Sequence, residues 1–213
     1  MNSQTANGQT ESVTRFLWIL LGDCHNLRLD SCDYFDRNII RCMVTKKKKP
    51  LLVPEMVPGP LWGRSAFRML GQRVAWTKKI RPNTLAEANN SCSFCRTSEG
   101  RMICHDKWQY NDEQAIATLV GFEIHCAMCD AVTHLGRAAM TGTPEEALLA
   151  ALNHLCRVNE CLPEVAEQIV GNALSQWKNR NKKKWTVKVQ LALVARYPEL
   201  GALPDFRPPP RSF

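Results

Sequence analysis

Four of the ten cysteines stand in two C-x-x-C pairs, a spacing typical of metal-binding sites. Together they form the pattern C-x2-C-x30-C-x2-C, made by Cys92, Cys95, Cys126 and Cys129. Two residues between paired thiolates let both sulfurs reach one tetrahedral ion, and four thiolates complete its shell. The pattern therefore predicts a structural zinc ion with no open position for substrate or water. An iron-sulfur or redox site is the alternative, for which the sequence offers no further support.

The segment between the two pairs is typical of a metal-clamped β-hairpin. The polar turn RTSEGR follows the first pair, the alternating stretch MICHDKWQY comes next, and a loop is expected at Asn111 and Asp112. His105 lies in the alternating stretch and could serve as a proton acceptor, because imidazole titrates near neutral pH. The alternative is a buried strand histidine that is satisfied by a carbonyl group.

Residues 91–137 resemble the HNH nuclease family, in the branch whose small ββα-metal fold is held by two C-x-x-C knuckles and a zinc ion. The resemblance implies hydrolysis of DNA phosphodiester bonds, with His105 as the catalytic base. It also implies a helix after the second knuckle, on which Asp130 and His134 hold a catalytic Mg²⁺ or Mn²⁺. A spacing of four residues places these two side chains on one helix face.

The sequence departs from the family pattern beside the predicted base. The family usually has an acidic metal ligand directly before the catalytic histidine, and Cys104 stands there. A thiolate is a soft ligand that magnesium and manganese bind poorly. Asp106 follows His105, but adjacent strand residues point to opposite faces. The family's middle asparagine has no match, since Asn111 lies far ahead of Cys126. A zinc-stabilised module that binds nucleic acid without cutting it is therefore the second hypothesis.

The basic residues are clustered, and the net charge of the chain is +8. Such an excess favours an acidic partner, and nucleic acid, with DNA expected, is the commonest one. A solvated basic face without a partner is the alternative. One cluster covers residues 46–49; the side chains predicted to contact phosphate are Arg137, Lys178, Arg180, Lys182, Lys183 and Lys184.

The segments before the zinc unit are expected to be mostly irregular. Residues 1–42 are predicted to form a weakly ordered extension. Residues 43–90 are predicted to form an irregular arm, since several prolines between 50 and 60 remove backbone donors and fix φ. A short helix is expected at residues 63–70, and a ribbon-like region from about Ala75.

The segments after the zinc unit, which spans residues 91–142, are expected to be mainly helical. Thr143 is a suitable N-cap and Pro144 a suitable first helical residue, and Pro163 opens a second helix. The two helices are predicted to pack as an antiparallel hairpin within residues 143–200. WTVKVQLALVARYPEL is expected to be a strand or a strand leading into a short helix, and residues 201–213 a disordered tail. The fold class is therefore α+β, and a protein-protein adaptor using the helical half is the third hypothesis.

The cysteines also bear on the compartment. A chain of 213 residues is long for a disulfide-stapled secreted domain, so metal-bound thiolates in a reducing, cytoplasmic compartment are favoured. The apolar run at residues 16–21 is too short to cross a bilayer, and no membrane association is expected. The sequence gives no indication of the oligomeric state.

Overall fold

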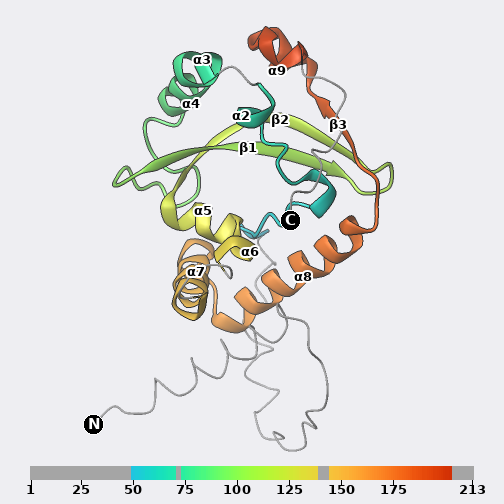
Figure 1. Ribbon diagram of the computed structural model, residues 1–213. Helices are drawn as coiled ribbons and strands as arrows, with labels where there is room; N and C mark the ends of the chain where they lie inside the picture. Colours follow the sequence, from blue (N-terminus) through green and yellow to red (C-terminus); the bar gives the residue numbers. More distant parts are fainter. Residues whose placement is uncertain (1–48, 71–72, 139–143, 203–213) are drawn as a thin grey trace, which may run out of the picture.

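The computed structural model describes residues 49–70, 73–138 and 144–202. A three-stranded sheet in the order β1-β2-β3 carries helices on both sides, with α3, α4 and α9 on one side and α5, α7 and α8 on the other (Figure 1). The α+β class is thereby confirmed. The predicted extension at residues 1–42, the cap at Thr143 and most of the predicted tail lie outside the described residues.

The predicted hairpin is present. β1 (Met102–Asn111) pairs antiparallel with β2 (Ile116–Cys126), with His105 opposite Glu123. His105 and Glu123 therefore share one face of the sheet, and Cys104 shares the other face with its partner Ile124. β3 (Thr186–Val189) pairs with β2 in parallel, a partnership that the sequence did not indicate.

A short helix follows the hairpin at the second cysteine pair. α5 (Ala127–Thr133) begins after Cys126, whose Sγ accepts a hydrogen bond from the Cys129 amide at 3.4 Å. The helix ends at His134, which is the C-cap, and α6 (Leu135–Ala138) follows. The Asp130 carbonyl still accepts from the His134 amide at 2.9 Å, so the two side chains remain one helical turn apart.

The segment before the first cysteine pair contains more helix than predicted. The expected helix at residues 63–70 is limited to α2 (Ala66–Met69), and the ribbon expected from Ala75 is wrong. Helical structure continues there through α3 (Arg73–Ala75), a π-helical turn (Trp76–Ile80) and α4 (Arg81–Glu87). Trp76 and Ile80 are both buried at helical spacing, and Trp76 packs edge-on against Phe122 of β2. Packing against the sheet therefore stabilises this segment as a helix.

The helices of the C-terminal half form a core on the α5 side of the sheet. α7 (Pro144–Asn159) and α8 (Pro163–Asn181) are present as predicted, and α7 packs against α5, α6 and α8. Figure 1 shows α7 nearly end on and α8 across the view, so they cross rather than run side by side. The buried residues of this core are Leu52, Cys92, Cys126, Cys129, Val132, Leu135, Leu148, Ala151, Leu152, Leu155, Ala166, Val170 and Leu174.

The end of the described chain confirms a strand that leads into a short helix. α9 (Leu191–Arg196) follows β3, and a 3-10 turn (Pro198–Ala202) closes the segment. Tyr197 and Leu200 are buried with Trp76 against the sheet. This second core covers the face of the sheet opposite to His105.

The irregular segment at residues 49–58 is held by hydrogen bonds to α7 and to the end of α5. The Asn159 side-chain oxygen accepts from the amides of Leu51 and Leu52 at 2.8 and 3.0 Å. The Glu55 amide donates to the Thr133 carbonyl at 2.9 Å, at the end of α5. The arm therefore runs beside the ligand-bearing helix.

Candidate metal centre

The four cysteines of the two pairs meet at one point. Cys92 and Cys95 lie in the turn before β1, whereas Cys126 and Cys129 lie at the junction of β2 and α5. One sulfur atom from each lies within 4.8 Å of the others, and the Cys95 and Cys126 Sγ atoms are 3.6 Å apart. Cys95 is half-buried and the other three are buried. The four thiols are placed to hold a metal ion.

The electrostatics of these thiols fit a bound cation. A hydrogen bond with Cys129 lowers the pKa of Cys92 to about 4, and the same hydrogen bond raises the pKa of Cys129. One sulfur is thus stabilised as a thiolate only while its neighbour keeps a proton. Ionising all four sulfurs at this separation requires a cation, because like charges otherwise repel strongly.

His154 of α7 supports the thiol cluster from outside. Its Nε2 lies 3.1 Å from the Cys129 Sγ, and its Nδ1 lies 2.6 Å from the Arg157 Nη2. Arginine can only donate, so Nδ1 accepts and Nε2 carries the proton that points to sulfur. His154 is buried in the core and faces the thiol cluster.

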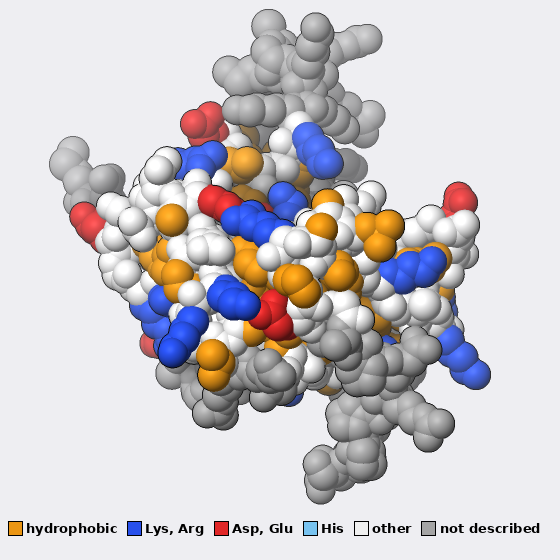
Figure 2. Space-filling view, turned by 90° about the horizontal axis from the view of Figure 1, so that it is seen from above, with side chains coloured by type: hydrophobic (Ala, Val, Ile, Leu, Met, Phe, Trp, Pro, Cys, Tyr) orange, Lys and Arg blue, Asp and Glu red, His pale blue; other side chains and the backbone are white. Residues whose placement is uncertain are grey.

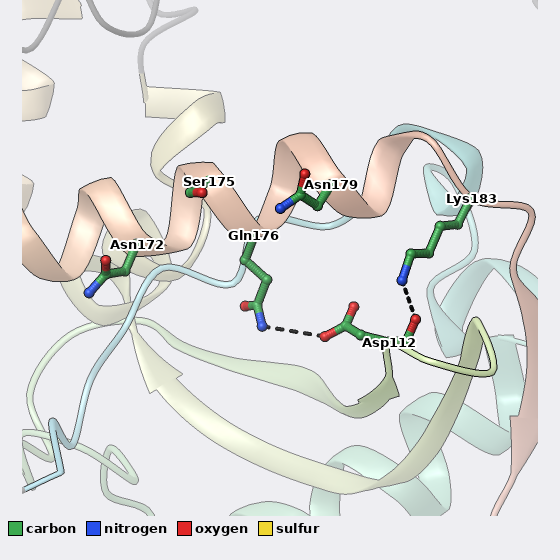
Figure 3. A pocket seen from close by; sticks show the side chains of 6 residues that line it. All are labelled: Asp112, Asn172, Ser175, Gln176, Asn179 and Lys183. Atoms are coloured by element: carbon green, nitrogen blue, oxygen red, sulfur yellow. Dashed lines mark hydrogen bonds between the residues drawn. The ribbon is translucent and has the colours of Figure 1, made fainter.

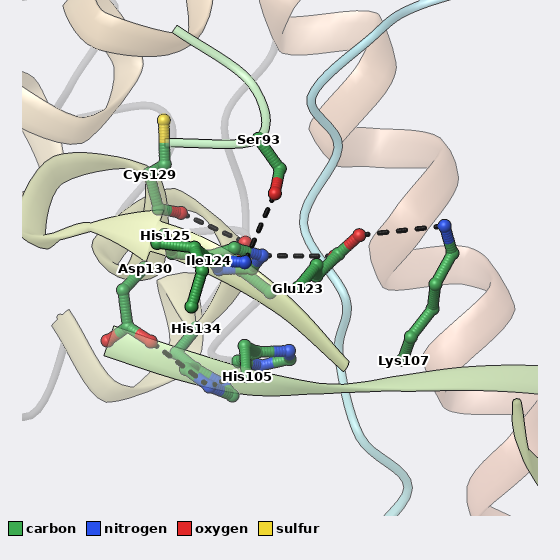
Figure 4. Close-up of polar contacts among 10 residues, drawn as sticks. Ser93, His105, Lys107, Glu123, Ile124, His125, Cys129, Asp130 and His134 are labelled. Carbon is green, nitrogen blue, oxygen red and sulfur yellow. Dashed lines mark hydrogen bonds and ion pairs between the residues drawn. The ribbon is translucent and has the colours of Figure 1, made fainter. Parts of the chain in front are cut away.

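His105, Asp130 and His134 form a second cluster on the other side of α5 (Figure 4). The His105 Nε2 lies 2.9 Å from the His134 Nε2, which in turn lies 3.7 Å from the Asp130 Oδ1. One potential ligand atom from each lies within 4.8 Å of the others. The structure therefore brings together all three residues to which a reactive role was assigned from the sequence.

This cluster reaches solvent along one edge. His105 and Asp130 are buried, whereas the His134 side chain is 25% exposed. Arg137, at 65% exposure, donates from Nη2 to the Asp130 Oδ2 and covers the carboxylate. Burial, together with the neighbouring His125 and His134, lowers the pKa of His105 to about 4. His105 is consequently uncharged near neutral pH.

Glu123 and His125 were not identified as site residues from the sequence, and they adjoin His105. His125 stacks on His105 with ring centroids 4.5 Å apart, and its Nε2 lies 3.0 Å from the Glu123 Oε1. Burial opposes ionisation of Glu123, but its contacts with His125 and Lys107 hold its pKa below the ordinary value. The alternation in FEIHC places these two residues on one face. Only the hairpin register shows that this is the face of His105.

Cys104 and Asp106 point away from the cluster, as the alternation of the strand predicts. Cys104 packs in the core formed with Trp76 and Tyr197, and burial raises the pKa of its thiol to about 11. The Asp106 Oδ2 accepts from the Ala66 amide at 2.7 Å. Neither side chain is available as a ligand beside His105.

The predicted phosphate contacts in and directly after α8 divide into two groups. Arg180 binds Asp112 through two hydrogen bonds of 2.7 and 2.9 Å, and the Lys183 Nζ donates to the Asp112 carbonyl. These contacts fasten the hairpin tip to α8 beside a polar hollow of about 410 Å³, which is also lined by Asn172, Ser175, Gln176 and Asn179 (Figure 3). Lys178, Lys182 and Lys184 are exposed.

The side of the molecule that carries α3, α4 and α9 has a mixed surface. Figure 2 shows Lys and Arg side chains there among hydrophobic ones. Lys79 and Arg196 are paired with Glu199 and Glu87. This face is therefore a weaker candidate for nucleic-acid contact than the exposed lysines in and directly after α8.

In comparisons with known proteins, the chain matches no protein-family model, no curated protein and no solved structure. Among the described residues, no helix has the length and apolar character needed to span a membrane.

Proposed function

We propose that the protein is an HNH-like, metal-dependent endonuclease that hydrolyses phosphodiester bonds of DNA, with a structural zinc ion in the four-cysteine cluster. The observation that carries the proposal is the convergence of His105, Asp130 and His134 next to that cluster. The uncharged imidazole, the carboxylate and the exposed Arg137 together provide groups that phosphodiester hydrolysis needs.

In this proposal His105 is the general base. Its Nε2 faces His134, on the side of the cluster that reaches solvent, whereas its Nδ1 is buried. Nε2 accepts the proton of the attacking water, and Arg137 leaves Asp130 to bind a phosphate oxygen. A divalent cation, Mg²⁺ or Mn²⁺, held by Asp130 and His134 would neutralise charge on the phosphate and the leaving oxygen.

The four-cysteine cluster has a structural role in this proposal. Thiolates favour zinc over the hard cations, and four of them leave no position for water or substrate. Burial of three of these cysteines in the helical core agrees with a stabilising ion. Free thiols of this kind persist in a reducing compartment, which supports a cytoplasmic location.

A module that binds nucleic acid without cutting it is the second candidate. It is favoured by the departure at Cys104, whose thiol faces away from His105 and leaves the usual acidic position without a ligand. The exposed Lys178, Lys182 and Lys184 would serve this function equally well.

Plasmid nicking and DNA binding, measured together, separate the two candidates. The proposal predicts manganese-dependent nicking by the wild type and at least about 100-fold slower nicking by His105→Ala, since general-base catalysis contributes roughly 10²- to 10⁴-fold. Salt-sensitive binding without nicking in magnesium or manganese would select the binding module. Absence of DNA binding at low salt would instead favour a protein-protein adaptor that uses α7 and α8.

A further inference from the structure

A third set of potential metal ligands lies on the hairpin, next to the cluster formed by His105, Asp130 and His134. It consists of His105, Glu123 and His125, and one ligand atom from each lies within 4.8 Å of the others. Glu123 is the cross-strand partner of His105, and His125 follows on the same face of β2. Figure 4 shows the three side chains gathered over the hairpin. Two paired strands hold them, so their spacing does not depend on a loop.

Two buried nitrogen atoms in this set have no hydrogen-bond partner. The Nδ1 atoms of His105 and His125 are both without one, and the residues are 9% and 0% exposed. Leaving a buried polar atom unsatisfied costs roughly 1 to 3 kcal/mol, so such atoms usually indicate a missing partner. The His105 Nε2 already faces His134, which leaves the His105 Nδ1 to receive a partner.

The chemistry of the set indicates the class of partner. Two imidazole nitrogens and one carboxylate oxygen suit borderline transition ions, whereas magnesium and calcium prefer oxygen ligands alone. The His125 Nε2 and the Glu123 Oε1 lie 3.0 Å apart, close to the separation of two ligand atoms on one zinc ion. An ion bound there would also satisfy the His105 Nδ1.

We propose that His105, Glu123 and His125 form a second transition-metal site, separate from the four-cysteine cluster, which takes an ion of the zinc or cobalt class. The site shares His105 with the cluster of Asp130 and His134. A neutral imidazole that binds a metal through Nδ1 carries its proton on Nε2. Zinc at this site would therefore prevent His105 from accepting a proton and would inhibit hydrolysis, a consequence that rests on the proposed function.

Zinc binding to the full-length chain, measured by competition with a chromophoric chelator, tests the site without any assay of activity. The wild type is expected to bind one equivalent in the four-cysteine cluster and a second at the hairpin. Glu123→Gln keeps the shape of the side chain and should weaken the second equivalent by at least about 100-fold, because ligand loss exceeds the 10- to 100-fold effect of an outer contact. His125→Asn should have the same effect.

Asp130→Asn is the matched control, because it changes the adjoining cluster and leaves the hairpin set intact. It should retain the second equivalent. The proposal is overturned if the wild type binds only one equivalent, if Glu123→Gln retains the second, or if Asp130→Asn loses it. Circular dichroism of each variant establishes that the fold is retained.

The inhibitory consequence is measured as the ratio of nicking rates without and with zinc in each protein. The ratio should be large for the wild type and close to unity for Glu123→Gln. A wild type that shows no nicking in manganese, yet binds the second equivalent, would contradict the proposed function and leave the metal site standing.

Discussion

Helix α5 separates two groups of ligands that differ in chemistry and in exposure. Its N-terminal end carries Cys126 and Cys129, which are buried in the helical core with Cys92. Asp130, which follows Cys129 in the first turn, and His134, which is the C-cap, meet His105 beside the exposed Arg137. Soft sulfur ligands in a closed shell hold an ion permanently, whereas nitrogen and oxygen ligands with an open edge can bind a reactant. A helix of seven residues thus carries ligands of both the cysteine group and the group that is proposed to be reactive.

Removal of the zinc from the cysteine group is expected to have the largest effect on stability. Structural zinc contributes roughly 10 to 16 kcal/mol of apparent binding energy, comparable to the whole stability of a domain. Cys129→Ser, or a strong chelator on the wild type, should abolish cooperative unfolding of the hairpin and α5 in a thermal melt followed by circular dichroism. Cys104→Ser removes a thiol outside the cluster and should respond to the chelator as the wild type does. A wild-type melting temperature unaffected by the chelator contradicts the structural role.

Asp130→Asn is expected to affect the reactive group and to leave the cysteine group intact. Loss of the carboxylate should weaken binding of the cation and slow manganese-dependent nicking by about 100-fold, while the zinc content stays unchanged. Nicking measured across manganese concentrations shows whether more cation restores the rate. Asp106→Asn makes the same change on the opposite face of the sheet and should leave the manganese requirement unaltered. Equal effects of the two substitutions would remove Asp130 from the cation site.

Glu55 tests the electrostatic surroundings of the reactive group. Burial raises the pKa of Glu55 from 4.5 to about 8, and its Oε1 has no hydrogen-bond partner. Between these values the folded chain keeps a proton that the unfolded chain has released, so stability falls as the pH rises through this window. Glu55→Gln should therefore be more stable than the wild type at pH 8, by roughly 4 kcal/mol, and similar to it at pH 4. Urea unfolding at both pH values measures the difference in stability between the two proteins. A difference that is the same at pH 4 and pH 8 would contradict the buried, protonated state.

The exposed lysines are expected to have the smallest effect, and only on binding. Lys182→Ala and Lys184→Ala should each weaken DNA binding a few-fold and lower the salt slope by about 1, with no change in the unfolding midpoint. Arg180→Ala is the contrasting variant, because its guanidinium holds Asp112 and lies 4.1 Å from the Tyr110 ring centre. That variant should lose stability. Salt slopes equal to the wild type in both lysine variants would exclude these residues from the DNA contact.

The local parts of this arrangement could be predicted from the sequence. The C-x-x-C pairs specify the cysteine cluster, because the spacing itself fixes how two thiols approach one ion. Alternation in MICHDKWQY specifies that Cys104 and His105 face opposite sides. The i to i+4 spacing of Asp130 and His134 specifies that they meet after one helical turn.

The parts that depend on pairing between distant segments could not be predicted. Glu123 and His125 join His105 only through the register of β1 and β2. The parallel partnership of β3 with β2, and the burial of Trp76 on the sheet, depend likewise on tertiary contacts. Arg180 illustrates the same limit, since composition marks it as a free positive charge although Asp112 binds it.

The most direct test of the division between the two groups is the nicking rate of His105→Ala, measured with manganese beside its zinc content and melting temperature. The division predicts loss of nicking with the zinc of the four-cysteine cluster retained and a melting temperature near that of the wild type, while Cys104→Ser retains all three. Nicking at the wild-type rate in His105→Ala, or loss of the cysteine-bound zinc together with activity, would contradict it.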